Sequence, residues 1–243
     1  MANSSVLKAL TREQIEKAFK KTKEETNIPG IELELVTEKY YERVFEFAWN
    51  HFALREPLYT ALCIERTDEL KSIFMSNYKF NLSLIFIDKE SKEIIALRTI
   101  RIACKDDVSD LDSIKSQSIR DLHAFDAYCD KLTDFFGHYG VTEAFFFHGL
   151  AVHEKYGRRG YGEKICRAAI NMIRHFGIDP VYIKGETSSK YGHKVYSNIG
   201  FEELLEVRYD SYEIDGRKPI QNTGIHESQK MFGMIVNQND GRD

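Results

Sequence analysis

The chain has few cysteines, no long apolar run and no apolar N-terminal segment. Its four cysteines, Cys63, Cys104, Cys129 and Cys166, lie far apart and form no Cys-x-x-Cys motif, which argues against a zinc site or a disulfide framework. We expect buried free thiols and no metal. A membrane span would need about 18 consecutive apolar residues, and a secretory signal would need an apolar core near the N-terminus. Neither is present, so the sequence predicts a cytosolic protein that binds no membrane.

An excess of basic residues is also missing. The chain has 34 Lys and Arg against 38 Asp and Glu, with a formal net charge of −4, so we expect no surface that neutralises nucleic-acid phosphates. The mildly acidic balance suits a cationic substrate. With 243 residues, 42% of them hydrophobic, the chain can bury one sizeable core. It has no internal repeat and no linker rich in Pro or Ser, and we expect one main domain that acts as a monomer.

Hydrophobic periodicity predicts helices and strands in a mixed order around one sheet. Residues 6–26 are polar with sparse apolar positions, which indicates an amphipathic helix on the body or a partly ordered tail. Strands are expected at residues 31–35, 82–87, 94–103, 143–152, 181–185, 201–214 and 229–236. Helices are expected at residues 38–52, 59–81, 105–139, 165–176 and 188–199. The apolar strand at residues 143–152 is expected to be central and buried on both faces.

The most informative stretch is residues 149–164, where this apolar strand runs into a glycine-rich basic loop that opens a helix. Glycines in such a loop let backbone N–H groups converge on an anion, and the positive end of the helix adds to the attraction. A plain tight turn would give the same Gly-x-x-Gly-x-Gly pattern at residues 157–162. A dinucleotide fold would need an acidic residue about 20 positions later, and a Walker loop would need Gly-Lys-Ser/Thr. Neither is found, and a phosphorylated cofactor of another class is expected.

Strand, loop and helix together resemble the acetyl-CoA loop of the GNAT superfamily of N-acetyltransferases, from about Phe145 to Phe201. The resemblance implies an α/β (α+β) GNAT fold: a mixed, mostly antiparallel central sheet flanked by helices, with splayed central strands. It implies acetyl-CoA as cosubstrate, with backbone N–H groups of the strand pairing with the pantetheine arm and polarising the thioester carbonyl. The cofactor-binding residues would be Leu150, Ala151, Val152, Gly157, Arg158, Arg159, Gly160, Tyr161, Gly162 and Glu163. The family usually has Arg or Gln at the first position of the loop, where this chain has Gly157. Arg158 and Arg159 follow directly in this chain.

A second segment, Lys-Val-Tyr-Ser-Asn-Ile-Gly-Phe at residues 194–201, resembles the family's helix ending in Tyr-x-x-x-Gly-Phe. The resemblance implies that Tyr196 is the general acid that protonates the departing CoA thiolate. The chemistry is reasonable because a phenol is neutral at pH 7 and able to donate. By residue type alone, a lone tyrosine on a helix is more often a core residue.

The segment from His51 to Leu58 resembles the Phe-Phe-x-x-Glu-Pro-Leu segment of insect-type arylalkylamine N-acetyltransferases. The resemblance implies that Glu56 is the catalytic base, directly or through water. A base is needed because such an amine, with a pKa of about 10, is mostly ammonium at pH 7. Pro57 restricts Glu56 to extended backbone, which is expected to aim the carboxylate away from the helix. Arg55 beside it is expected to lower the carboxylate pKa, or to pair with it in a simple turn.

Ser188 begins the segment Ser-Ser-Lys-Tyr-Gly, which resembles a Ser-Ser-x-Tyr-Ser pattern of the same subfamily but ends in Gly192. The resemblance gives Ser188 a catalytic role, and proton delivery is expected to depend more on Tyr196. We expect His148 and His153 to be structural. A set of aromatic residues could line an arylalkyl pocket or fill the sheet core: Phe145, Phe146, Phe147, Tyr209 and Tyr212.

The expected function is acetyl transfer from acetyl-CoA to a small primary amine, an arylalkylamine such as dopamine, serotonin, tyramine or octopamine, by direct attack in a ternary complex. A polyamine or other aliphatic-amine acetyltransferase would share every cofactor residue. A protein-lysine acetyltransferase would need an open peptide groove, and a non-catalytic acyl-CoA-binding module would bind without turnover. Residues 1–30 are expected to form a helical extension and 31–243 one GNAT domain, with the acceptor side, flanking helices and hairpin at 59–142 and the acetyl-CoA-binding core at 143–201.

Overall fold

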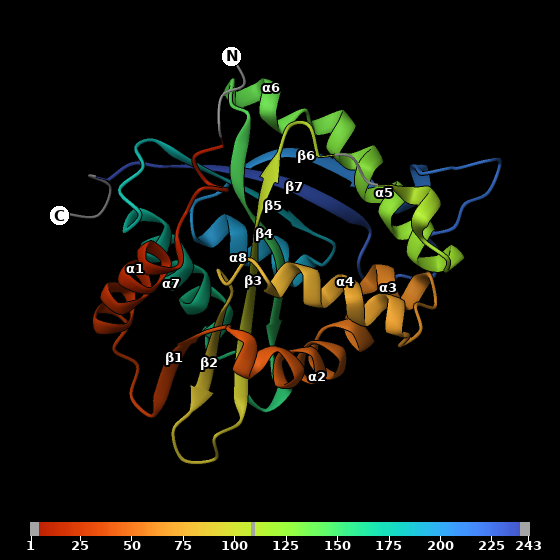
Figure 1. Ribbon diagram of the computed structural model, residues 1–243. Helices are drawn as coiled ribbons and strands as arrows, with labels where there is room; N and C mark the ends of the chain where they lie inside the picture. Colours follow the sequence, from red (N-terminus) through yellow and green to blue (C-terminus); the bar gives the residue numbers. More distant parts are fainter. Residues whose placement is uncertain (1–4, 108–109, 239–243) are drawn as a thin grey trace.

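One seven-stranded sheet organises the computed structural model, which describes residues 5–107 and 110–238 (Figure 1). Across the sheet, the strands are β1 (Ile31–Leu35), β2 (Leu84–Asp88), β3 (Ile94–Cys104), β4 (Glu143–Val152), β5 (Val181–Thr187), β7 (Ser228–Val236) and β6 (Glu202–Arg208). Within this described sheet β4 and β5 are the parallel pair, and the other neighbours are antiparallel. The mixed, mostly antiparallel sheet is therefore confirmed.

Helices cover both faces of the sheet. One face carries α1 (Arg12–Glu25), α7 (Tyr161–Arg174) and α8 (Lys190–Asn198). The other carries α2 (Tyr41–His51), α3 (Pro57–Ala61), α4 (Asp68–Tyr78) and α5 (Gln117–Thr133), which runs into α6 (Phe135–Tyr139). Short 3-10 turns lie at Glu38–Tyr40, Ala53–Arg55, Leu111–Ser113, Glu154–Tyr156 and Tyr209–Ser211. Among the described helices none is long and apolar enough to cross a membrane.

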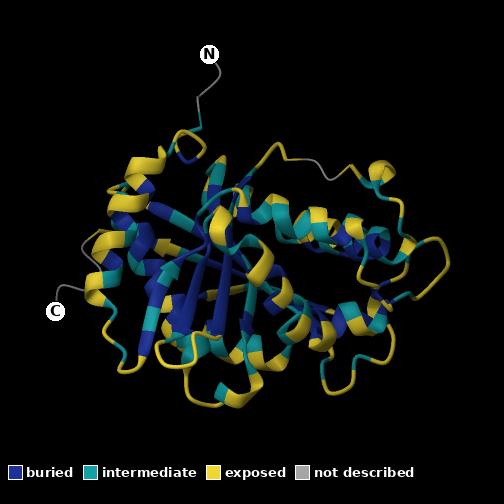
Figure 2. Ribbon diagram, turned by 60° about the horizontal axis from the view of Figure 1, so that its bottom comes forward, coloured by how far each residue is buried: buried dark blue, intermediate teal, exposed yellow. Residues whose placement is uncertain are grey.

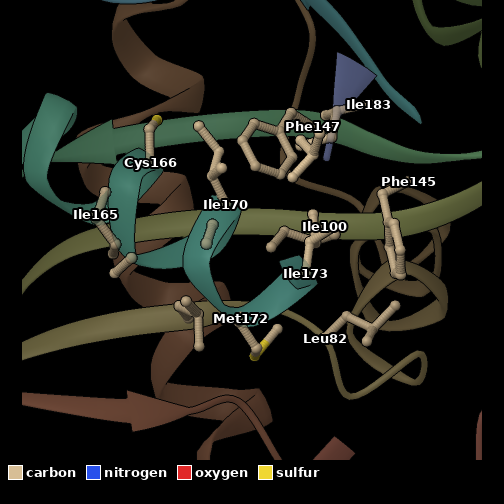
Figure 3. Packing of buried hydrophobic residues seen from close by; sticks show 14 of the residues in the cluster. Leu82, Ile100, Phe145, Phe147, Ile165, Cys166, Ile170, Met172, Ile173 and Ile183 are labelled. Atoms are coloured by element: carbon tan, nitrogen blue, oxygen red, sulfur yellow. The ribbon is translucent and has the colours of Figure 1, made fainter. Parts of the chain in front are cut away.

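The largest core lies between α7 and the sheet. Helical spacing puts Ile165, Ala169, Met172 and Ile173 on one stripe, and all are buried, as expected for an amphipathic helix on a sheet. Figure 3 shows α7 side chains facing Phe147, Ile100 and Ile183 of the central strands. The strands beneath are buried through the middle of the molecule (Figure 2). This core fixes the position of α7 relative to β4.

Three of the expected elements are wrong in extent. The helix expected at 59–81 is interrupted because Cys63 adopts a positive φ of 52° and Thr67 caps a new helix by accepting the N–H of Leu70. The helix expected from residue 105 begins only at Gln117. The strand expected at 201–214 ends at Arg208, where a 3-10 turn folds Tyr209 into the core.

The cysteines are free thiols, as expected, but they are not all buried. Cys129 and Cys166 are buried, whereas Cys104 is half-buried and Cys63 is exposed. The exposure of Cys63 follows from its place in the turn that separates α3 from α4.

The central strands β4 and β5 separate partway along their length. They pair only over Phe145–Phe147 and Ile183–Gly185. On the other side of β4 the register with β3 shifts, because Thr99 pairs with Gly149 and Ile100 with Phe147, which leaves His148 without a partner in β3. Such a β-bulge bends the strand. It also reverses the alternation of side chains, so that Leu150 and Val152 face α7 and Ala151 faces α2.

Gly185 is the last β5 residue paired with β4. We predict that close packing requires a glycine at this position. A Cβ atom there would collide with the ring of Tyr196, which is 1% exposed and packs against Phe201 and Phe232 at centroid distances of 4.7 and 5.0 Å. We expect Gly185→Ala to lower the free energy of unfolding by about 1–3 kcal/mol, measured by urea denaturation.

The matched control is Gly162→Ala, where a new Cβ would meet its nearest neighbours at 3.6–3.7 Å, an ordinary contact. This variant is expected to keep or slightly raise stability, because alanine favours a helix over glycine by up to about 1 kcal/mol. Equal stability of the two variants would mean that the Tyr196 ring can move aside.

Candidate active site

The separation of β4 from β5 exposes one backbone edge of β4. Leu150, Ala151 and Val152 pair with β3 through Arg98, Leu97 and Ala96, but no described strand pairs with their other edge. Backbone N–H and C=O groups on such an edge need partners. An extended ligand with amide groups, such as the pantetheine arm implied by the sequence, fits this edge as an added strand would.

The glycine loop between β4 and α7 suits an anion. Residues 157–160 are exposed, Arg158 and Gly160 adopt positive φ angles of 60° and 75°, and Gly160 is the N-cap of α7 with no side-chain cap. The first N–H groups of a helix without a side-chain cap are available to a phosphate. The guanidinium of Arg159 lies 5.4 Å from the ring centroid of Tyr156, beside the loop. The residues present therefore fit the pyrophosphate of acetyl-CoA.

The neighbouring positions at the start of α7 hold the helix in place. Tyr161 is half-buried against Phe86, with 6.2 Å between ring centroids. The carboxylate of Glu163 accepts a hydrogen bond from Asn198 at 2.6 Å, which ties α7 to α8. The side chain of Glu163 therefore helps to hold α7 and α8 together.

Both departures from the family pattern have a steric context. Gly157 has φ −57° and ψ 153°, which any residue adopts, but a Cβ there would lie 3.1 Å from the carbonyl of Glu154. At Gly192 a Cβ would collide with the Thr187 side chain. A serine does not fit beside Thr187 in this arrangement, so the last serine of the pattern is replaced by close packing between β5 and α8.

Tyr196 lies where β4 and β5 separate. Its hydroxyl donates to the carbonyl of Phe147, at the end of the paired segment, and accepts a hydrogen bond from Arg98, both at 3.1 Å. Burial raises the pKa of Tyr196, and the Arg98 guanidinium partly opposes that effect. The phenol is therefore neutral at pH 7 and keeps a proton to donate.

Glu56 lies on the opposite side of the sheet, at the start of α3. Its backbone is extended (φ −71°, ψ 125°), as expected before Pro57. Its carboxylate caps the following helix α3 by accepting the N–H of Tyr59 at 2.6 Å. The expected effect of Arg55 is wrong, since that guanidinium turns outward and pairs with Glu154.

The environment of Glu56 brings the pKa of its carboxyl group close to neutral. Burial raises the pKa of Glu56 to about 7, although hydrogen bonds from Ser188 and from backbone N–H groups of Tyr59 and Leu58 act in the opposite direction. A base is most effective when its pKa lies near the working pH. The structure thus brings Glu56 and Ser188 together from distant parts of the chain.

Two carboxylates near Glu56 were missed in the sequence. Glu186 on β5 raises the pKa of Glu56 further, and Asp126 on α5 has its own pKa raised well above the usual value by burial and then by Glu186. Burial acts to raise the pKa of Glu186, but that pKa is lowered because His148 and Lys184 lie nearby. Nothing local distinguishes these carboxylates from surface ones, although Glu186 follows a predicted strand and lies two residues before Ser188.

His148 and His153 have different surroundings. His148 occupies the bulge, with its Nδ1 atom 3.4 Å from Oε1 of Glu186, so it belongs to the group around Glu56. The ring of His153 stacks on the ring of His51, with 4.1 Å between centroids, and accepts the N–H of Lys155, which is the contact of a capping residue.

Two surface hollows, of about 280 and 320 Å³, are lined by neither Glu56 nor Tyr196. The second hollow is lined in part by His51 and His153.

The aromatic set expected as one group is divided by the sheet. Phe145 and Phe147 pack toward α7. Phe146 faces the Glu56 side, where Arg101 and Lys184 lie over its ring at 4.5 and 4.3 Å. Tyr209 and Tyr212 pack on Phe125 of α5. Only part of the set is therefore available to an acceptor on the Glu56 side.

The comparisons with known proteins agree with this arrangement. Residues 128–201 match the acetyltransferase (GNAT) family. No curated protein matches the chain.

Several solved structures share the fold. Arylalkylamine N-acetyltransferase 2 from Aedes aegypti has 22% identity and a TM-score of 0.77, over 85% of this chain and 99% of that one. A mosquito arylalkylamine N-acetyltransferase like 5b has 18% identity and a TM-score of 0.79, over 85% and 100%. The Drosophila melanogaster polyamine N-acetyltransferase, which catalyses the formation of N-acetylagmatine, has 17% identity and a TM-score of 0.75, over 84% and 99%.

At these identities the solved structures establish the fold, and the family match covers the strand, glycine loop and helix described above. Residues 128–201 therefore match the part of a GNAT acetyltransferase that carries the glycine loop, and acetyl-CoA is the cosubstrate of that family.

Proposed function

We propose that the protein acetylates a small primary amine, an arylalkylamine such as dopamine, serotonin, tyramine or octopamine, by direct attack in a ternary complex with acetyl-CoA. The observation that carries the proposal is the buried carboxyl of Glu56, with a pKa of about 7, bonded to Ser188. A carboxyl group in that state can accept a proton from an ammonium ion near neutral pH. Tyr196 on the other face supplies a candidate acid.

Each residue has one role in this proposal. Acetyl-CoA supplies the activated acetyl group when bound. Glu56 accepts the proton of the ammonium ion, directly or through water, which frees the nitrogen lone pair for attack. Backbone N–H groups at Leu150, Ala151 or Val152 stabilise the negative charge that develops on the carbonyl oxygen. Tyr196 gives its hydroxyl proton to the departing sulfur, and Ser188 orients Glu56.

Two features support an arylalkylamine as acceptor. The side chains of Tyr59, Phe146 and Tyr209 present aromatic rings on the Glu56 side of the sheet. The carboxylate of Glu56 lies close enough to Tyr59 and Tyr209 to raise the pKa of both, after the larger effect of their own burial. Aromatic rings favour a flat apolar group. One of the solved relatives is named an arylalkylamine N-acetyltransferase and another arylalkylamine N-acetyltransferase like 5b.

A second candidate acceptor is an amine with two cationic groups. Asp126 and Glu186 lie close enough to Glu56 to change its surroundings electrostatically. Only one carboxylate is needed as base, so the remaining ones suit a second ammonium or guanidinium group. The relative from Drosophila melanogaster, which forms N-acetylagmatine, supports this alternative.

The pH dependence tests Glu56 as the base. Because the base is active only when deprotonated, kcat/KM for the amine is expected to rise as the pH increases through about 7, the pKa of Glu56. Glu56→Gln should remove this step and lower kcat at pH 8 by about 100-fold or more. Deprotonation of the amine itself would give a second, separate rise in kcat/KM at about pH 10. Persistence of the step near pH 7 in the variant would assign the base to another group.

The same burial predicts an opposite effect on stability. The pKa of Glu56 is raised from 4.5 unfolded to about 7 folded, so the folded state binds more protons between these values. Stability therefore falls as the pH rises through that window, by up to about 3 kcal/mol. Glu56→Gln should lose this pH dependence and be the more stable protein at pH 8 in urea denaturation. The Glu163→Gln variant is the control and should keep the dependence.

An amine panel decides the acceptor. With acetyl-CoA and detection of the released thiol, tyramine and serotonin are expected to show at least about tenfold higher kcat/KM than agmatine or spermidine, a difference of roughly 1.4 kcal/mol. The reverse order would favour the second candidate, and Asp126→Asn should then weaken the dicationic amine selectively. Binding of CoA without turnover of any amine would identify a non-catalytic acyl-CoA-binding module.

A further inference from the structure

Arg98 is a buried charge with no acidic partner. It lies in the middle of β3, is 1% exposed, and its Nε atom has no hydrogen-bond partner. Among the described residues no carboxylate forms an ion pair with it. Removing a guanidinium from water costs several kcal/mol, and an ion pair is the usual compensation. An arginine in this state needs another explanation.

Its partners are the proposed acid and its surroundings. The Nη1 atom donates to the Tyr196 hydroxyl at 3.1 Å and lies 3.8 Å from the sulfur of Cys166, which Figure 3 shows on α7. The guanidinium carbon lies 4.7 Å from the Phe147 ring centroid. Ring contacts compensate the charge in part. Arg98 also pairs across the sheet with Leu150, on the strand with the free edge.

We infer that Arg98 is a positioning residue that holds Tyr196 and stabilises the negative charge formed on its oxygen when it acts as an acid. The inference rests on the proposed function, because it assumes that Tyr196 donates a proton. The geometry supports it in one specific way. Arg98 donates to the phenolic oxygen, so its hydrogen bond survives loss of the phenolic proton and becomes charge-assisted.

Proton transfer from Tyr196 breaks one bond and forms another. The O–H bond of Tyr196 breaks, its electron pair stays on the phenolic oxygen, and the proton forms an S–H bond with the departing thiolate. The hydroxyl proton first turns from the Phe147 carbonyl toward the sulfur by rotation about the C–O bond. The phenolate opposite Arg98 regains a proton from water after the products leave. Because the donor is in place before the charge develops, little reorganisation is needed.

If Arg98 had a purely structural role, its replacement would lower the stability of the protein and have no specific effect on the chemical step. A buried charge without a counter-charge is a poor packing element, and replacement by an apolar residue of similar volume is often neutral or stabilising. We therefore expect Arg98→Met to unfold at an equal or higher urea concentration than the natural protein while its kcat falls about tenfold, which corresponds to about one pH unit in the acidity of Tyr196. Arg98→Lys keeps the charge and should recover part of the rate.

Titration of residue 196 without ligands tests the contact directly. A polyfluorinated tyrosine at position 196 ionises at lower pH than tyrosine, and its ¹⁹F resonance reports the ionisation. Arg98→Met is expected to raise the midpoint by about one pH unit or more, the effect of losing a cation within hydrogen-bond distance. Cys166→Ala removes the other polar contact of Arg98 and should leave the midpoint nearly unchanged. An unchanged midpoint in Arg98→Met would overturn the inference.

A double-mutant cycle separates this inference from the proposed function. If Arg98 acts through Tyr196, Arg98→Met slows the natural protein about tenfold but has little further effect on Tyr196→Phe. Equal losses in both backgrounds, with reduced stability, would make Arg98 a structural residue and overturn the inference. If Tyr196→Phe alone leaves kcat unchanged while the ¹⁹F midpoint still responds to Arg98, the proposed acid is wrong and the Arg98–Tyr196 contact stands.

Discussion

The arrangement of the site depends on an interrupted hydrogen-bond ladder between β4 and β5. Pairing stops at Phe147 and Gly185, and the bulge at His148 turns the rest of β4 away. One interruption therefore leaves a free backbone edge, reverses which side chains face α7, and puts the Tyr196 hydroxyl next to the last paired carbonyl. A continuous ladder would satisfy those backbone groups internally and leave no edge for a ligand.

Burial of charged groups is the second feature of the site. Glu56 and Arg98 are both buried without an ion-pair partner among the described residues, and each opposes stability. On opposite faces they produce opposite effects, since burial makes the Glu56 carboxyl a better proton acceptor and the Arg98 charge makes the Tyr196 phenol a better donor. The rest of the core, packed between α7 and the sheet, compensates the unfavourable energy of both groups.

Local signals in the sequence predicted most strands of the sheet and the glycine-rich turn between β4 and α7. The apolar run at Glu143–Val152 and the glycines at 157–162 carry their meaning in their own neighbourhood. Tertiary contacts were not predictable in this way. The pKa of Glu56 depends on Ser188 and Glu186, far along the chain, and the neighbouring Arg55 turned out to bind elsewhere. Arg98 was visible as one of two arginines in an otherwise largely apolar strand, but only packing of α8 identifies Tyr196 as its partner.

The division of the site between two faces has a consequence for divergence. Glu56, Asp126 and Glu186 are covered by α3 and α5, whereas the glycine loop and Tyr196 belong to α7 and α8. Substitutions in α3 and α5 can reshape the first face without replacing any residue of α7 or α8. A lineage with this architecture can exchange one acceptor for another while it conserves its acetyl donor, which is consistent with relatives of one fold whose names record different amines.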